Sequence, residues 1–227
     1  MIRILAVLLT LIPGAAVSFA QIASARTVQA SGNATIYAPP DQAQLDVGVV
    51  TNGSTAQEAA QLNATMTTAV LAAIKSVLGS SGTVQTVSYY IAPRYSNVST
   101  QSGAIVGYTA SNTVRVTTVD LSIIGKLIDA ANQAGANTVG NLNFGLQDPE
   151  PKLQQALAQA TKQAMAHAGA IAAGLGATLG QVITAQQGSA YTPIVAPSAI
   201  AGAVASTPVQ TGTVSVYASV SVTAQLQ

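Results

Sequence analysis

Cysteine is absent from all 227 residues of the chain. This absence excludes disulfides, thiolate metal sites, cysteine nucleophiles and attachment of a lipid through an N-terminal cysteine. Whatever compartment the protein occupies, it has to fold on its packed core alone. A mature chain of about 200 residues is long enough to bury such a core.

Charged side chains are also scarce. They make up 7% of the chain, against about 25% in an average soluble protein. The eight basic and seven acidic residues give a net charge of +1, and removal of an N-terminal segment containing Arg3 would leave seven of each. A neutral chain does not favour a nucleic-acid or anionic-membrane partner, and a low charge density removes one barrier to self-association.

Histidine occurs once, as His167. A hydrolase triad needs a histidine between a serine and an acid, and no serine here lies in a Gly-x-Ser-x-Gly turn. A zinc site needs three or four ligands, whereas the acids are scattered singly, apart from Asp148 and Glu150, which helix capping explains. We therefore expect no catalytic residue, no cofactor and no metal site, and His167 is interpreted as an edge or solvated helix residue.

Long apolar runs are confined to the start of the chain. Arg3, the apolar run from Ile4 to Ile12 and the small residues Ser18 and Ala20 are typical of a secretory signal peptide covering residues 1–20, with cleavage after Ala25 as the alternative. The run is too short for a membrane anchor. The sequence thus predicts an exported protein without a transmembrane segment in its mature chain.

The remaining residues alternate between strand and helix patterns. Ser54 and Gln57 suggest a capping box before the first helix, and Asp120 suggests the N-cap of the second. The expected strands are Arg26–Tyr37, Gln42–Thr51, Thr83–Tyr95, Ile105–Thr118, Thr138–Leu146, Gln181–Gln187 and Val214–Leu226. The expected helices are Thr55–Leu78, Leu121–Ala134 and a third that begins at Asp148–Glu150 and ends near Leu175, and Gly188–Gly212 is expected to be a loop.

This order, β-β-α-β-β-α-β-α-β-β, predicts an α+β fold in which three helices pack on one side of a mainly antiparallel sheet. Residues 26–227 are expected to form one domain, or two intimately packed subdomains.

A tyrosine-bearing hairpin is the most distinctive local feature. Its tyrosines form either a ligand-stacking face or ordinary cross-strand packing, and packing is the better supported of the two. Its two arginines either bridge to acids, line an oligomer contact or lie in a solvated face, and the solvated face is the better supported of these interpretations for each. The candidate ligand or interface surface comprises Tyr89, Tyr90, Arg94, Tyr95, Tyr108 and Arg115.

Together with other short motifs, the hairpin resembles the SIMPL-domain family of bacterial envelope proteins, long catalogued as a domain of unknown function. The matching elements are Pro40–Ala43, Thr86 with Pro93 and Tyr95, Gly107–Tyr108, Asp120–Leu121, Gly135–Asn137 and Asn143–Phe144. One departure is Gln163 and His167, which stand in the alanine-rich helix where relatives commonly carry charged residues.

The resemblance implies export to the periplasm or outer membrane, assembly of some members into rings or channel-like oligomers, and in some cases protection against oxidative stress. It supplies no reaction.

Two functional hypotheses follow. The first is a non-enzymatic envelope protein that assembles with itself, and with possible envelope partners, in a structural or stress-protective role. The alternative is a periplasmic module that binds a peptide or small apolar ligand near the tyrosine hairpin and the Gly188–Gly212 loop. An outer-membrane barrel is a weaker hypothesis because three helices interrupt the strands, and an enzyme is the least supported.

Overall fold

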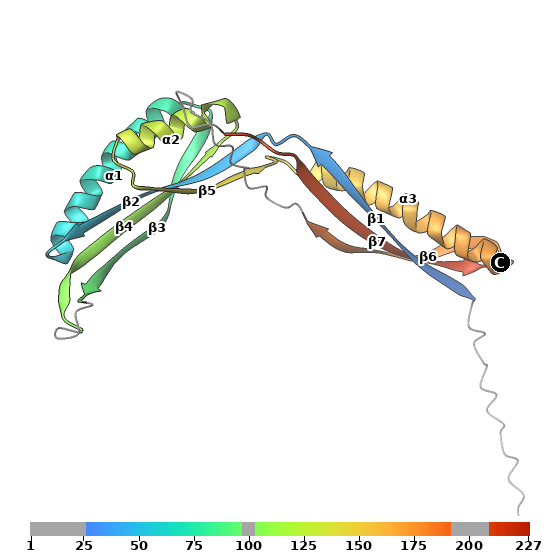
Figure 1. Ribbon diagram of the computed structural model, residues 1–227. Helices are drawn as coiled ribbons and strands as arrows, with labels where there is room; N and C mark the ends of the chain where they lie inside the picture. The colour runs from blue at the N-terminus through green and yellow to red at the C-terminus, as the bar shows by residue number, and fades with distance from the viewer. Residues whose placement is uncertain (1–25, 97–102, 192–208) are drawn as a thin grey trace, which may run out of the picture.

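The computed structural model describes residues 26–96, 103–191 and 209–227, and the predicted signal peptide lies outside these ranges. Figure 1 shows two lobes placed end to end. The strands are β1 (Thr27–Ala38), β2 (Gln42–Gly53), β3 (Gly82–Tyr95), β4 (Ile105–Thr118), β5 (Thr138–Gly145), β6 (Leu179–Tyr191) and β7 (Val214–Leu226). The helices are α1 (Ala56–Leu78), a 3-10 turn (Leu121–Ile123) that continues into α2 (Ile124–Gln133), and α3 (Glu150–Gly174).

The first lobe is an antiparallel sheet of order β3-β4-β2-β5, covered on one face by α1 and α2. Alternate residues of β2 point toward the helices, and Leu45, Val47 and Val49 are buried there against Ile74 of α1 and Leu127 of α2. The opposite face of the sheet carries polar residues and no helix. This is the hydrophobic-in, polar-out pattern of a one-sided antiparallel sheet.

The N-cap of α1 differs by one residue from the sequence prediction, whereas the helix ends at Leu78, before Gly79, as predicted. Thr55, not Ser54, is the N-cap, and its hydroxyl accepts a hydrogen bond from the Glu58 backbone N–H at 3.2 Å. Glu58 then folds back to accept from the Ser54 backbone N–H at 2.8 Å and from its hydroxyl at 2.6 Å. Glu58 therefore makes the capping-box hydrogen bond that the sequence predicted for Gln57. A charged carboxylate forms the stronger bond, and its negative charge is stabilised at the positive end of the helix dipole.

The second lobe is an antiparallel sheet of order β1-β7-β6 with α3 on one face. The predicted alternation of the last strand is confirmed, since its valines and alanines face α3 and its serines and threonines face away. One alanine in each turn of α3 is fully or almost fully buried: Ala156, Ala160, Ala164, Ala168 and Ala172. Small side chains on both surfaces bring the helix close to the sheet.

Helix and strand come closest at Gly32 in β1. A Cβ atom added at this glycine would overlap the Ala160 carbonyl oxygen and the Ala164 backbone nitrogen of α3. The backbone of α3 therefore rests directly on the backbone of β1, and only glycine fits at this position.

Strand β6 is longer than predicted. The sequence indicated a strand over 181–187 followed by a loop over 188–212, but β6 spans Leu179–Tyr191, and residues 192–208 are not described. The strand continues past Gly188 because β7 offers a long partner, so that Ala190 pairs with Ala218 and Tyr191 with Tyr217. Tertiary pairing outweighs the local turn preference of Gly188 and Ser189.

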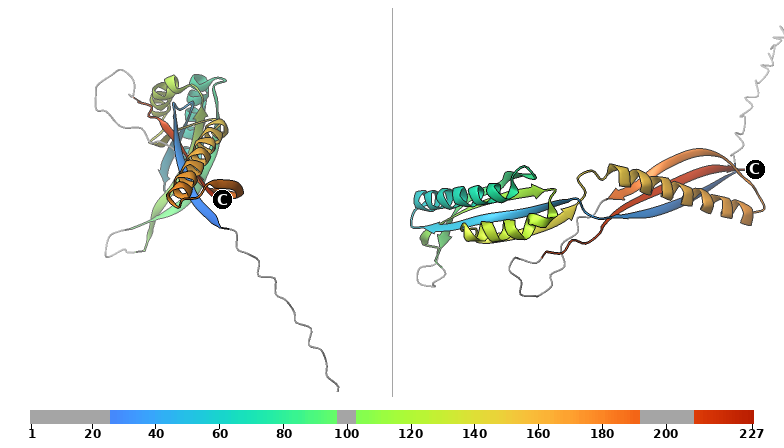
Figure 2. Two further views of the ribbon diagram at one scale, coloured as in Figure 1. Left: turned by 90° about the vertical axis from the view of Figure 1, so that its right-hand side faces the viewer. Right: turned by 90° about the horizontal axis from the view of Figure 1, so that it is seen from above.

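The α+β class and antiparallel pairing are confirmed, but the strands divide into two sheets rather than one. Viewed from the side, the molecule is an arch with all three helices on its outer side, and the view from above in Figure 2 shows the same helices in front of both sheets. The helix-free faces of the two sheets form the inner side of the arch. Whether the lobes fold as one domain or as two subdomains stays a prediction.

Candidate interaction surfaces

Each sheet has two edges, and the β1 edge is capped by α3. Gln163 of α3 accepts a hydrogen bond from the Asn33 backbone N–H at 2.7 Å, and His167, one turn on, donates through Nδ1 to the Ser31 carbonyl oxygen at 2.8 Å. Both side chains satisfy groups that a free strand edge would offer to another chain. His167 is thus an exposed residue with a structural contact, and its ring binds a carbonyl rather than a serine hydroxyl.

The β5 edge is protected by its shape. The strand has eight residues, and Asn141 lies in the left-handed region with φ of 49°, next to a register shift. Directly before β5 begins, the side chain of Asn137 accepts a hydrogen bond from the Val50 N–H at 2.8 Å and donates one to the Val50 carbonyl at 2.7 Å. Short, bulged edges are poor templates for pairing with another chain.

The β3 and β6 edges are neither short nor capped by a helix side chain in the described part of the chain, although both contain register shifts. They are the longest edge strands, with 14 and 13 residues, and most of their residues are exposed on both faces. Arg94 is the single charged residue in the two strands. Their large exposed apolar side chains are Val87, Tyr89, Tyr90, Ile91 and Tyr95 in β3, and Val182, Ile183 and Tyr191 in β6.

The structure does not gather the predicted hairpin tyrosines into one cluster. Tyr89 lies opposite Asn112 and Tyr108 opposite Pro93, on the helix side of the sheet, whereas Tyr90 lies opposite Ser111 on the helix-free side. Tyr95 lies at the tip opposite Ile105, and Arg94 lies opposite Gly107. Alternation along a strand places neighbouring residues on opposite faces, so the run of tyrosines in the sequence is split.

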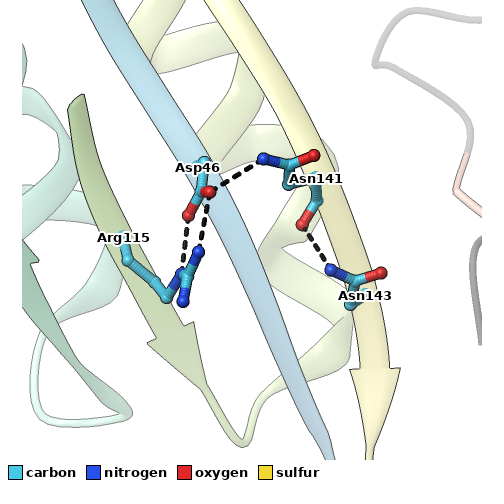
Figure 3. Close-up of polar contacts among 4 residues, drawn as sticks. All are labelled: Asp46, Arg115, Asn141 and Asn143. Atoms are coloured by element: carbon cyan, nitrogen blue, oxygen red, sulfur yellow. Dashed lines mark hydrogen bonds and ion pairs between the residues drawn. The ribbon is translucent and has the colours of Figure 1, made fainter. Parts of the chain in front are cut away.

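Arg115 takes part in a polar network on the helix-free face (Figure 3). Its guanidinium donates two hydrogen bonds to Asp46, at 2.7 and 2.9 Å, and Asn141 donates a third to the same carboxylate at 3.0 Å. These bonds, above all those from Arg115, lower the pKa of Asp46 despite the burial that opposes ionisation. The network ties β4, β2 and β5 together, and within it the charges of Asp46 and Arg115 balance.

A tyrosine cluster that the sequence prediction missed lies on the helix-free face of the second sheet. The rings of Tyr191 and Tyr217 are 5.2 Å apart, centroid to centroid. Tyr37 extends from the same face of β1, two residues beyond Thr35, which pairs with Tyr217. The alternation of the last strand could have revealed Tyr217, but Tyr191 fell in a predicted loop.

A shallow cleft of about 190 Å³ lies at the end of the first sheet nearest the second lobe. It is lined by uncharged residues, among them Gln42, Thr83, Thr117, Val119 and Gln147. Within the described residues, no group of three or more histidine, cysteine, aspartate or glutamate side chains could hold a metal ion. No helix in those residues is long and apolar enough to cross a membrane.

These features define a class: an α+β protein of two one-sided sheets, in which one edge is capped, one edge strand is short, and two edge strands are long and uncapped. The sequence comparison is specific. Residues 28–224 match the SIMPL family, described as a protein of unknown function (DUF541), and the chain belongs to this family.

Two curated relatives are 26 kDa periplasmic immunogenic proteins, from Brucella melitensis and from Brucella abortus. Each is 29% identical to this chain over 133 residues, which is 57% of this chain and 53% of the relative. The chain therefore matches about half the length of these relatives.

Proposed function

We propose that this protein is a non-enzymatic periplasmic envelope protein that assembles with copies of itself through the β3 and β6 edges, in a structural or stress-protective role. One observation carries the proposal: protection of the four sheet edges is unequal. The β1 edge is capped by Gln163 and His167, and β5 is short and bulged. The two longest edge strands are not capped by side chains in the described part of the chain, and although both contain register shifts, they extend over 14 and 13 residues.

Long exposed edges are a liability in a monomer, because unpaired N–H and C=O groups recruit further strands. Proteins usually protect such edges with lysines, prolines or bulges. β6 has no charged residue, and β3 has only Arg94 and Pro93 near its end. Register shifts occur in both strands, but each retains a run of exposed apolar residues.

The two edges belong to different sheets at different ends of the arch. Each copy can therefore contact two neighbours at once. Pairing of β3 with β6 of the next copy would be heterologous, and such contacts produce a ring when the rotation closes. The family and the periplasmic names of the relatives support an exported location.

Light scattering behind size-exclusion chromatography on residues 26–227 tests this proposal. Tyr90→Lys and Val182→Lys each place a charge on one open edge, at side chains that are 53% and 45% exposed. Leu62→Lys is the matched control, because Leu62 is 46% exposed on α1, away from both edges. A lysine on an edge opposes strand addition, whereas an exposed substitution changes folding stability by only about 0.5 kcal/mol.

The expected result is a discrete multi-copy mass for the original protein and for Leu62→Lys, and a smaller mass for each edge variant. A monomer at every concentration would refute the proposal. So would an assembly whose mass neither edge variant changes while circular dichroism shows that all variants are folded.

A binding module for a peptide is the second candidate, and the open β3 edge favours it, because an extended peptide can add to a sheet edge as a further strand. The split of the tyrosines between two faces disfavours a small apolar ligand at the hairpin. A monomer whose melting temperature rises with an added peptide would support this candidate over assembly.

A further inference from the structure

The helix-free face of the second sheet has no ionised side chain. Strands β1, β6 and β7 contain no aspartate, glutamate, lysine or arginine anywhere in their 12, 13 and 13 residues. The side chains on this face are hydroxyls, amides and phenols: Gln29, Ser31, Asn33, Thr35, Ser219, Ser221 and Thr223 are among them. At about 3.3 Å per residue, the face extends for nearly 40 Å along β1.

Three tyrosines lie at the end of this face nearest the first lobe. Tyr37 and Tyr191 are 70% and 58% exposed, and Tyr191 packs against Tyr217. An exposed tyrosine presents a flat apolar ring with a polar tip, so it can stack on a ligand while it forms a hydrogen bond. The chain has seven tyrosines and no tryptophan, and three of the seven gather here.

The cleft of about 190 Å³ lies on the neighbouring lobe, five residues along the chain from Tyr37 at Gln42. Thr83 and Thr117 face each other across β3 and β4 on the helix-free side of that sheet. The side chains of Thr83, Thr117, Gln42 and Gln147 have no hydrogen-bond partner among the described residues. They are therefore free to bind a ligand of their own polarity.

We propose that the inner side of the arch is a binding surface for a neutral carbohydrate chain, with Tyr37, Tyr191 and Tyr217 as the stacking platform. A sugar ring has an apolar face that stacks on tyrosine, and hydroxyl groups that match rows of serine, threonine, asparagine and glutamine. The absence of charge is the discriminating feature. Nucleic acids and anionic lipids require basic residues, and this sheet has none.

Self-association through this face fits the observations less well. Interface cores are apolar and poor in serine, whereas this face is dominated by hydroxyls and amides. The binding surface is a face of the sheet rather than the β3 or β6 edge, and it does not require assembly. Because Tyr191 lies in β6, Tyr37→Ala in β1 is the variant that separates sugar binding from assembly. Failure of the sugar test therefore leaves the proposed assembly intact, and failure of the assembly test leaves the sugar-binding proposal intact.

Isothermal titration calorimetry with soluble N-acetylglucosamine oligosaccharides tests the proposal, and glucose oligosaccharides with α and β linkages serve as comparison ligands. The protein is residues 26–227, with Tyr37→Ala and Tyr191→Ala as variants. Tyr95→Ala is the matched control, since Tyr95 is 56% exposed at the hairpin tip of the other lobe. Circular dichroism checks the fold of each variant.

The expected result is saturable binding of at least one oligosaccharide, weakened about tenfold by either platform variant, the ratio that about 1.4 kcal/mol of lost contact produces. Tyr95→Ala should bind as the original protein does. No binding of any of these sugars at millimolar concentration would overturn the proposal. Affinities of Tyr37→Ala and Tyr191→Ala that both equal the affinity of the original protein would also overturn it. So would a loss of assembly mass in Tyr37→Ala without sugar binding, which would assign the face to a second copy.

Discussion

Replacing Gly32 by alanine tests the contact on which the second lobe is built. The added methyl group would overlap backbone atoms of Ala160 and Ala164, which cannot rotate away as a side chain can. Overpacking of this kind costs about 1–3 kcal/mol. A displaced α3 would also stretch the hydrogen bonds from Asn33 to Gln163 and from His167 to Ser31, which adds about 1 kcal/mol for this exposed pair.

The substitution also has a compensating effect, because alanine restricts the unfolded chain and contributes about 0.4–1 kcal/mol in favour of folding. The net expectation for Gly32→Ala is a loss of about 2 kcal/mol. Urea unfolding followed by far-ultraviolet circular dichroism measures it. For an m-value of about 2 kcal/mol/M, the midpoint should fall by about 1 M.

Gly169→Ala is the control for this prediction. Gly169 lies inside α3, and a Cβ atom there would meet no atom within 4 Å. Alanine is the better helix former by about 0.8–1 kcal/mol, so this variant should be more stable than the original protein. If Gly32→Ala unfolds at the same urea concentration as the original protein, the direct contact between helix and strand does not exist.

Two further predictions concern buried polar groups of the first lobe. Asn63 is fully buried in α1 and donates to the carbonyls of Val49 and Ala110. Asn63→Ala should therefore lower the free energy of unfolding by about 1–3 kcal/mol in the same urea assay, and an unchanged midpoint would contradict this. Asp46→Asn should cost about 1 kcal/mol at neutral pH because it weakens the pair with the half-exposed Arg115. The folded-state pKa of Asp46 is lowered, so its contribution to the free energy of unfolding is present above the unfolded pKa of about 3.9 and disappears as pH falls through the folded value. A loss of stability in Asp46→Asn that does not change with pH would contradict an origin in the ion pair.

Regular periodicity made most of the fold predictable from the sequence. The alternation of Val214, Val216 and Val220 with serines predicts the last strand. In α3 the spacing predicts a stripe of Leu153, Leu157, Ala160, Ala164, Ala168 and Ile171, of which the three alanines are buried, whereas Ile171 is 43% exposed. Both patterns depend only on which face of an element is buried. The prediction of α3 also benefited from Asp148, whose side chain accepts from the Glu150 N–H at 3.0 Å.

Features that depend on pairing between distant segments were not predictable. The separation into two sheets follows from the pairing of β1 with β7, at opposite ends of the chain, and no local pattern reveals it. The same pairing extends β6 past Gly188 and brings Tyr191 to Tyr217. The hairpin residues Tyr89 and Tyr90 are adjacent in the sequence but lie on opposite faces of β3, because neighbouring residues of a strand alternate between faces.

The protection of edges was likewise visible only in three dimensions. Gln163 and His167 stood out in the sequence as a departure from charged residues in the family, but their role as caps of β1 requires the position of α3. With β1 and β5 protected, β3 and β6 are the edges through which we propose that copies meet.

Cross-linking between copies tests this central claim most directly, and the absence of cysteine from the chain makes each introduced thiol unique. Tyr90→Cys and Val182→Cys variants of residues 26–227 would be treated with a short bismaleimide, singly and as a mixture, with Leu62→Cys as the control. Because paired strands lie about 4.8 Å apart, edge pairing predicts covalent dimers from the edge variants, or from their mixture, and none from Leu62→Cys. Edge variants that cross-link no more than Leu62→Cys, at concentrations where light scattering shows an assembly, would contradict the account.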